Sequence, residues 1–105
     1  MNEKKIISLL GIAKKAGKTV CGTDMTVESI RKRASSVKVI LLASDASANT
    51  VKRIKNTSEY YSVPLICMQI DKEELAKTVG SIAQVSVIGV LDDGFASAML
   101  KAMTN

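Results

Sequence analysis

Two short apolar runs constrain the fold of this chain more than any other feature. One is VKVILLA at residues 37–43, and the other is VSVIGVL at residues 85–91. A run that is apolar at nearly every position indicates a strand covered on both faces, because a solvent-facing side would require alternation with polar residues. The chain is therefore expected to form a buried sheet with helices on each side.

Helical patterns alternate with these runs and with two further strand-like segments. Gly17 is expected to stop the first helix, and Thr23 or Asp24 can cap the second. The apolar stripes of these two helices are Ile6, Leu9, Leu10 and Ala13 in the first, and Met25, Val27, Ile30 and Ala34 in the second. Three further helices are expected: 50–61, a short one from the cap Asp71 through Lys77, and 95–103. Strands are expected at 18–21, 37–43, 65–70, directly after Pro64, and 85–91.

This alternation predicts an α/β fold, a three-layer α-β-α sandwich with a small mixed sheet of about four strands. The 105 residues are expected to form one domain, residues 1–105. The longest purely apolar run, Val39–Ala43, is far too short to span a membrane. The charged, helical start indicates a mature helix and not a signal peptide, so a cytoplasmic protein without a membrane partner is expected.

Charge is distributed unevenly along the chain, which has a net charge of +5. Residues 1–55 contain twelve Lys or Arg against four acids, whereas residues 56–105 contain three Lys against six acids. This asymmetry indicates one face drawn to a polyanion and another that is neutral or acidic, although lysines can also serve only to keep helices soluble.

Catalysis finds little support in the residues. The chain has no histidine, the commonest general acid–base group. Ser44 beside Asp45 has no third partner, and no GxSxG or Walker A motif occurs. Cys21 and Cys67 are isolated and form no CxxC, so they are expected to be free, buried thiols in a reducing cytoplasm. We therefore expect no enzyme activity, no cofactor and no metal site.

The acidic pairs need a separate interpretation. Glu73–Glu74 and Asp92–Asp93 could bind a cation, but adjacent acids at helix starts more often match the helix dipole.

The stretch from Gly22 to Met25 is the best candidate for a binding site. The first amides of a helix are unpaired and carry partial positive charge, and a glycine lets a phosphate or base edge approach the backbone. Cations lie on both sides of it in the sequence: Lys14, Lys15, Lys18, Arg31, Lys32 and Arg33. Each piece also has an ordinary structural explanation. Only Tyr60, Tyr61 and Phe95 are aromatic, so base stacking on exposed rings is not expected.

At nearly full length the chain resembles a known family. The segments LLGIAKKAGK, the G-x-D opening of the second helix, ASDAS-NT, YY-VP and DDGFA are similar in order and spacing to the kink-turn-binding ribosomal protein superfamily of the L-seven-Ae and L-thirty-e type. Within it, the bacterial YlxQ-like branch is the most similar. No single motif is specific, but their arrangement together is.

The resemblance implies a non-catalytic, ribosomal or ribosome-associated protein. It would bind structured RNA, rRNA or another kink-turn RNA, as a monomer and with ribosomal proteins as further partners. The recognition turn and helix would be Gly22, Thr23, Asp24, Met25 and Glu28, and Lys18 would contact phosphate. Asp45 would line the same site from a second loop, and Ile82 and Ala83 would cover a flipped-out nucleotide. Arg31 and Lys32 would compensate for the negative charge of Glu28.

This chain departs from strong kink-turn binders at three of these positions. It has carboxylates at Asp24 and Glu28 and a thioether at Met25, where strong binders carry amide or basic side chains. Asp24 can still accept hydrogen bonds from guanine N1–H and N2–H. Glu28 near phosphates is repulsive, on the order of 1 kcal/mol when solvated.

Another class of function stays open. The same sandwich can serve as a protein-interaction module without tight RNA binding, with the acidic half as the docking surface: Glu59, Asp71, Glu73, Glu74, Asp92 and Asp93. A small enzyme is the least supported alternative.

Overall fold

The computed structural model describes residues 1–104. Helices and strands alternate along this part of the chain, as the sequence predicts. Their bounds are α1 Glu3–Lys15, β1 Thr19–Cys21, α2 Thr23–Lys32, the 3-10 turn η1 Ala34–Ser36, β2 Val39–Leu42, α3 Ala48–Tyr61, β3 Leu65–Cys67, α4 Lys72–Thr78, β4 Val87–Val90 and α5 Asp93–Thr104.

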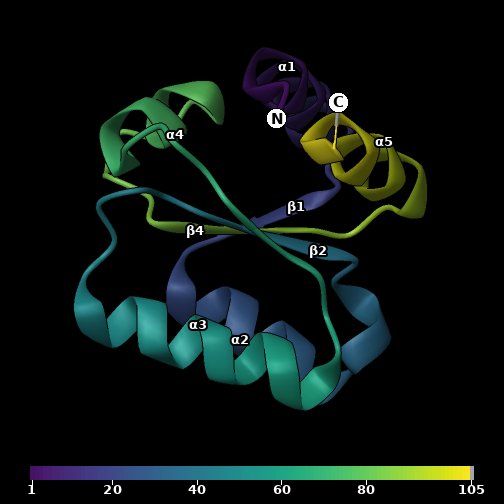
Figure 1. Ribbon diagram of the computed structural model, residues 1–105, viewed down its shortest axis with the longest axis vertical. Helices are drawn as coiled ribbons and strands as arrows, with labels where there is room; N and C mark the ends of the chain where they lie inside the picture. The colour runs from purple at the N-terminus through teal and green to yellow at the C-terminus, as the bar shows by residue number, and fades with distance from the viewer. Residues whose placement is uncertain (105) are drawn as a thin grey trace.

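The four strands form one mixed sheet in the order β1-β4-β2-β3. β4 pairs antiparallel with both β1 and β2, and β2 pairs parallel with β3. Helices α1, α4 and α5 lie on one face of the sheet and α2 and α3 on the other (Figure 1). The predicted three-layer α-β-α sandwich with a small mixed sheet is confirmed.

The two apolar runs form the two central strands. All four residues of β2 and all four of β4 are buried. Because successive side chains of a strand point to opposite faces, Val39 and Leu41 join the core under α1, α4 and α5, whereas Ile40 and Leu42 join the core under α2 and α3. One sheet thus supplies both hydrophobic cores, which explains why these strands are apolar at every position.

Gly89 lets α2 lie close to the sheet. A Cβ at Gly89 would stand 2.9 Å from the Val20 Cγ1 atom and 3.2 Å from the Thr26 Cγ2 atom of α2. The first distance is shorter than real Cβ contacts and the second is tighter than most, so a side chain at this position would push the neighbouring side chains away. The Thr26 side chain is fully buried, and its Oγ1 has no hydrogen-bond partner among the described residues.

Several local predictions need correction. In the predicted stripe of α2, Val27 and Ile30 are buried, but Met25 is 61% exposed and Ala34 lies exposed in η1, beyond the end of the helix. Thr26 occupies the inner face in their place, because the 3.6-residue period brings it under the helix together with Ile30.

The strand expected at 65–70 ends at Cys67. The Met68 amide still bonds to the Leu42 carbonyl, but the next amide, of Gln69, donates to the Glu3 carboxylate of α1, which draws the chain away from the sheet. Both cysteines are free, as expected, but Cys67 is exposed and Cys21 half-buried, so the prediction of buried thiols is wrong. None of the helices within residues 1–104 is long and apolar enough to cross a membrane.

Candidate nucleic-acid interface

Three segments meet at the end of the sandwich where β1 and β2 finish and β4 begins. The Gly22 amide donates to the Val87 carbonyl at 2.8 Å, and the Ala43 amide donates to the Ser86 carbonyl at 2.8 Å. The strand pairing therefore places Gly22, the loop 43–47 and the loop 80–86 side by side. We call this end of the molecule the tip; it lies on the left of Figure 1, where α2 and α3 begin.

The start of α2 at the tip differs from the other helix starts. Side-chain oxygens cap the other four: Asn2 for α1, Ser47 for α3, Asp71 for α4 and Asp92 for α5. α2 instead follows Gly22, which makes no side-chain cap and has a φ of 100°, a conformation that favours glycine. The expected cap by Thr23 or Asp24 is therefore wrong, since both already belong to the helix.

The missing cap leaves a polar backbone surface. The first backbone hydrogen bond into α2 is made by Thr26, whose amide donates to the Gly22 carbonyl at 3.0 Å. The amides of Thr23, Asp24 and Met25 precede it and point outward from the helix start. Such a group of amides, at the positive end of a helix dipole, is suited to an oxygen acceptor such as a phosphate.

Two side chains of this first turn project into solvent. The Asp24 carboxylate is 89% exposed and forms an ion pair with Arg53 of α3. Met25 exposes its thioether beside it. The tip therefore offers amide donors, one carboxylate acceptor and one apolar side chain within a single helical turn.

Asp45 does not point freely into this site. Its Oδ1 accepts a hydrogen bond of 2.8 Å from the Lys72 amide, the first residue of α4. Asp45 thus fastens the loop after β2 to α4, and its position at the tip is structural.

The loop before β4 carries the most exposed apolar side chain at the tip. Ile82 is fully exposed and Ala83 is also exposed. The Ser81 hydroxyl donates to the Ala83 carbonyl at 2.8 Å, which holds the loop in a turn around Ile82. An isoleucine held in solvent by its own loop is available to cover an apolar group of a ligand.

Three of the expected site residues lie away from the tip. Lys18 precedes β1, and its carbonyl accepts from the Leu91 amide at the opposite end of the sheet. Gly22 lies four positions after Lys18 along an extended segment, a span of about 13 Å. Arg31 and Lys32 lie in the last turn of α2, about 12 Å along the helix axis from its start. Glu28 lies between the two ends and pairs with Lys32 at 4.0 Å.

We call this opposite end of the sandwich the base. The Lys38 amide bonds to the Val90 carbonyl there, so Lys38 and Lys18 flank the end of β4 from both sides. The base gathers seven cations, namely Lys14, Lys15, Lys18, Arg31, Lys32, Arg33 and Lys38, of which Lys38 lies 3.8 Å from Asp93. The cations that surround Gly22 in the sequence do not surround it in space.

The tip instead has an excess of negative charge, with five acids against three cations. The cations there are Lys52 and Arg53 in the first half of α3 and Lys72 at the start of α4, and the acids are Asp24, Asp45, Asp71, Glu73 and Glu74. Sequence reasoning missed Arg53 as a site residue, because its partner Asp24 is 29 positions away. The only signal was a basic segment early in the third helix, VKRIK, which carries no information on where it docks.

Comparison with known families gives a match over most of the chain. Residues 4–100 match the model of the ribosomal protein L7Ae/L30e/S12e/Gadd45 family. A relative in Enterococcus faecium named RNA-binding protein YlxQ is 38% identical over 96 residues, which cover 90% of this chain and 87% of that protein. A relative of the same name in Bacillus subtilis strain 168 is 36% identical, covering 90% of this chain and 91% of that protein.

Solved structures give the same assignment for the fold. A protein of unknown function from Bacillus halodurans superposes with a TM-score of 0.87 at 27% identity, covering 96% of this chain and 98% of that one. The Giardia lamblia 15.5kD RNA binding protein superposes with a TM-score of 0.80 at 13% identity, covering 97% and 84%, and so shares the fold. On the family match and the two relatives, this chain belongs to the ribosomal protein L7Ae/L30e/S12e/Gadd45 family.

Proposed function

We propose that this chain is a non-catalytic RNA-binding protein, ribosomal or ribosome-associated, that recognises a kink-turn-like bend in structured RNA with its tip. The observation that carries the proposal is the uncapped start of α2, flanked by the exposed side chains of Asp24, Met25 and Ile82. The relatives named RNA-binding protein YlxQ support RNA as the partner.

Each group at the tip has a separate role in this proposal. The amides of Thr23 to Met25 donate to a phosphate or to a base edge that faces the open helix start. The Asp24 carboxylate leaves Arg53 and accepts hydrogen bonds from guanine N1–H and N2–H instead. Ile82 and Ala83 cover the apolar face of a nucleotide that the bend has turned out of its stack. Thr23 and Gly22 let the RNA approach the backbone.

The base of the sandwich contributes affinity without recognising the bend. A kinked RNA has two helical arms, and an arm that leaves the tip along α2 passes Glu28 and reaches Arg31 and Lys32. The same arm, or its partner along β1, reaches Lys18. Phosphate contacts at such distances from the bend give binding that depends on salt and not on sequence.

The acidic docking surface of the alternative hypothesis receives less support. Its six residues are divided between α3, α4 and the start of α5, with Asp92 capping α5 and Asp93 paired with Lys38. They do not form one surface. We therefore favour RNA as the partner, in the cytoplasm and with the chain as a monomer.

A gel-shift titration with two RNAs of equal length tests the proposal. One contains an internal loop with tandem G·A pairs beside a three-nucleotide bulge, and the other is fully paired. We expect tighter binding to the looped RNA at every salt concentration, with affinity falling at a log–log slope of roughly −0.7 to −0.9 per phosphate neutralised. Equal binding to both RNAs, or a flat salt response, would contradict it.

A further inference from the structure

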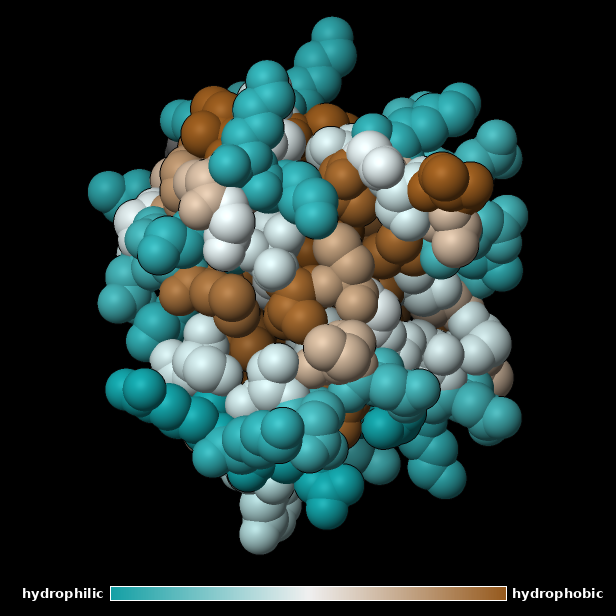
Figure 2. Space-filling model, turned by 180° about the vertical axis from the view of Figure 1, so that it is seen from behind, coloured by the Kyte–Doolittle hydropathy of each residue, from teal (hydrophilic) through white to brown (hydrophobic). Residues whose placement is uncertain are grey.

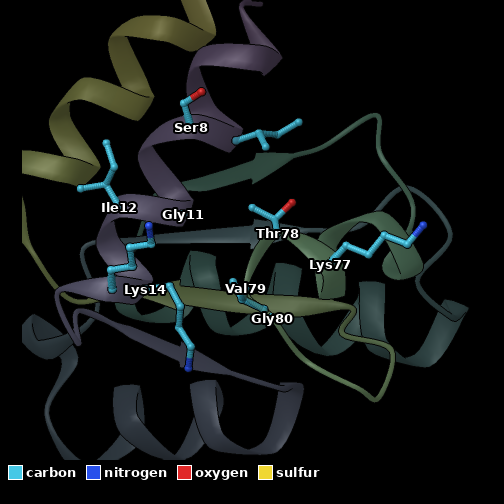
Figure 3. A pocket seen from close by; sticks show the side chains of 10 residues that line it. Ser8, Gly11, Ile12, Lys14, Lys77, Thr78, Val79 and Gly80 are labelled. Atoms are coloured by element: carbon cyan, nitrogen blue, oxygen red, sulfur yellow. The ribbon is translucent and has the colours of Figure 1, made fainter.

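A groove of about 700 Å³ separates α1 from the end of α4 (Figure 3). Its apolar lining includes Ile7, Ile12 and Val79. Ile12 is 55% exposed although it is large and apolar. On the face seen from behind in Figure 2, hydrophobic residues gather near the middle and hydrophilic residues surround them. In the groove itself, an exposed Ile12 next to lysines marks an interaction site.

Gly11 supplies an independent argument for an occupant. It lies in the middle of α1, where glycine stabilises a helix less than alanine does. A Cβ at this position would meet nothing within 4 Å, so packing inside the protein does not require a glycine. Gly11 also lines the groove. A molecule that comes close to the α1 backbone at this point would account for the missing side chain.

The charges of the groove indicate what kind of molecule this is. The charged residues in its lining are Lys14 and Lys15 of α1 and Lys77 of α4, and all three are exposed. Figure 3 shows Lys14 on the α1 side and Lys77 on the α4 side. An occupant therefore needs negative charge along its edges and apolar groups toward the floor. The apolar lining favours protein side chains over RNA, because a phosphate backbone offers no apolar groups to cover Ile7, Ile12 and Val79.

We propose that this groove binds an acidic amphipathic helix of a partner protein. The apolar stripe of that helix lies on Ile7, Ile12 and Val79, its closest approach is at Gly11, and its carboxylates meet the three lysines. The partner site uses none of the residues assigned above to the RNA bend. It shares only Lys14 and Lys15 with the base, which does not recognise the bend, so failure of either proposal leaves the other standing.

The test uses a synthetic acidic peptide of about 16 residues, with Leu at helical spacing and Glu on the flanks, titrated into the isotope-labelled full-length chain. We expect amide chemical-shift changes confined to α1 and residues 77–80. A second peptide with Lys in place of Glu should bind at least about tenfold more weakly, because it meets like charges. The Ile12→Glu variant should lose about tenfold in affinity for the acidic peptide.

Two further variants keep the test decisive. Met103→Glu changes another exposed apolar residue, at the end of α5, and should bind the peptide unchanged. Gly11→Gln fills the open space above α1 and should weaken binding, even if Ile12→Glu fails to fold. The proposal would be overturned by shifts outside the groove or by equal binding of both peptides. It would also be overturned if a single-stranded oligouridylate shifted Gly11 and residues 77–80, which lie outside the base, as strongly as the peptide does.

Discussion

The tip and the base of the sandwich divide between them two properties that occur together in the sequence. The tip has the open helix start, the exposed Ile82 and more acids than cations. The base has seven lysines and arginines, with Asp92 engaged as a cap and Asp93 in a pair. The open start of α2 and the cations in its last turn are thus about 12 Å apart along the helix axis. Under the function proposed above, the tip would distinguish RNAs and the base would bind their backbone without discrimination.

The largest effect is expected for Ile82→Asp. The change removes the apolar cover from the turned-out nucleotide and places a negative charge beside RNA. We expect affinity for looped RNA to fall between about tenfold and a hundredfold, with little change for paired RNA. Because Ile82 is fully exposed, the fold should persist. Met103→Asp is the matched control, and a similar fall for both RNAs would break the distinction between the two ends.

A smaller and uniform effect is expected when the base is neutralised. The triple variant Lys18→Ala, Arg31→Ala and Lys32→Ala should weaken looped and paired RNA alike, by about tenfold at low salt. The salt slope measured by filter binding should become shallower by about one unit for each phosphate that the variant no longer neutralises. A selective weakening of the looped RNA would instead show that these cations act at the bend.

Reversing the charge of Glu28, which lies between the tip and the base, should strengthen RNA binding. Glu28 lies along the path from tip to base and pairs only at 4.0 Å with Lys32. We expect Glu28→Lys to tighten RNA binding about fivefold, the factor that corresponds to removing a repulsion on the order of 1 kcal/mol. The same titration would contradict this if affinity stayed unchanged or fell.

The smallest effect is expected at Arg53, the partner of Asp24. Arg53→Gln breaks an ion pair between exposed side chains, so urea unfolding should show a loss of only about 0–1 kcal/mol. Binding of looped RNA should change by less than about threefold, because Asp24 must leave Arg53 in any case to accept hydrogen bonds from a guanine. A much larger change would mean that Arg53 itself touches the RNA.

Much of the fold could be predicted because it depends on local rules. The buried runs around Val39 and Val87 required a sheet covered on both faces, and Asp71 and Asp92 mark helix starts through their own side chains. Met25 could not be placed by its spacing, because a methionine is apolar enough to join a stripe and yet lies outside the core here. The expected cap at Thr23 or Asp24 failed because Gly22 takes the cap position without a side chain.

The sequence by itself determined the layers of this protein, the alternation of its elements and the position of Gly22 at a helix start. Only the tertiary structure decided which end each charge occupies. Lys18 and Arg31 lie close to Gly22 along the chain, but an extended strand and a helix carry them more than about 10 Å away from it. Arg53, distant in sequence, reaches Asp24 because α2 and α3 pack side by side on one face of the sheet.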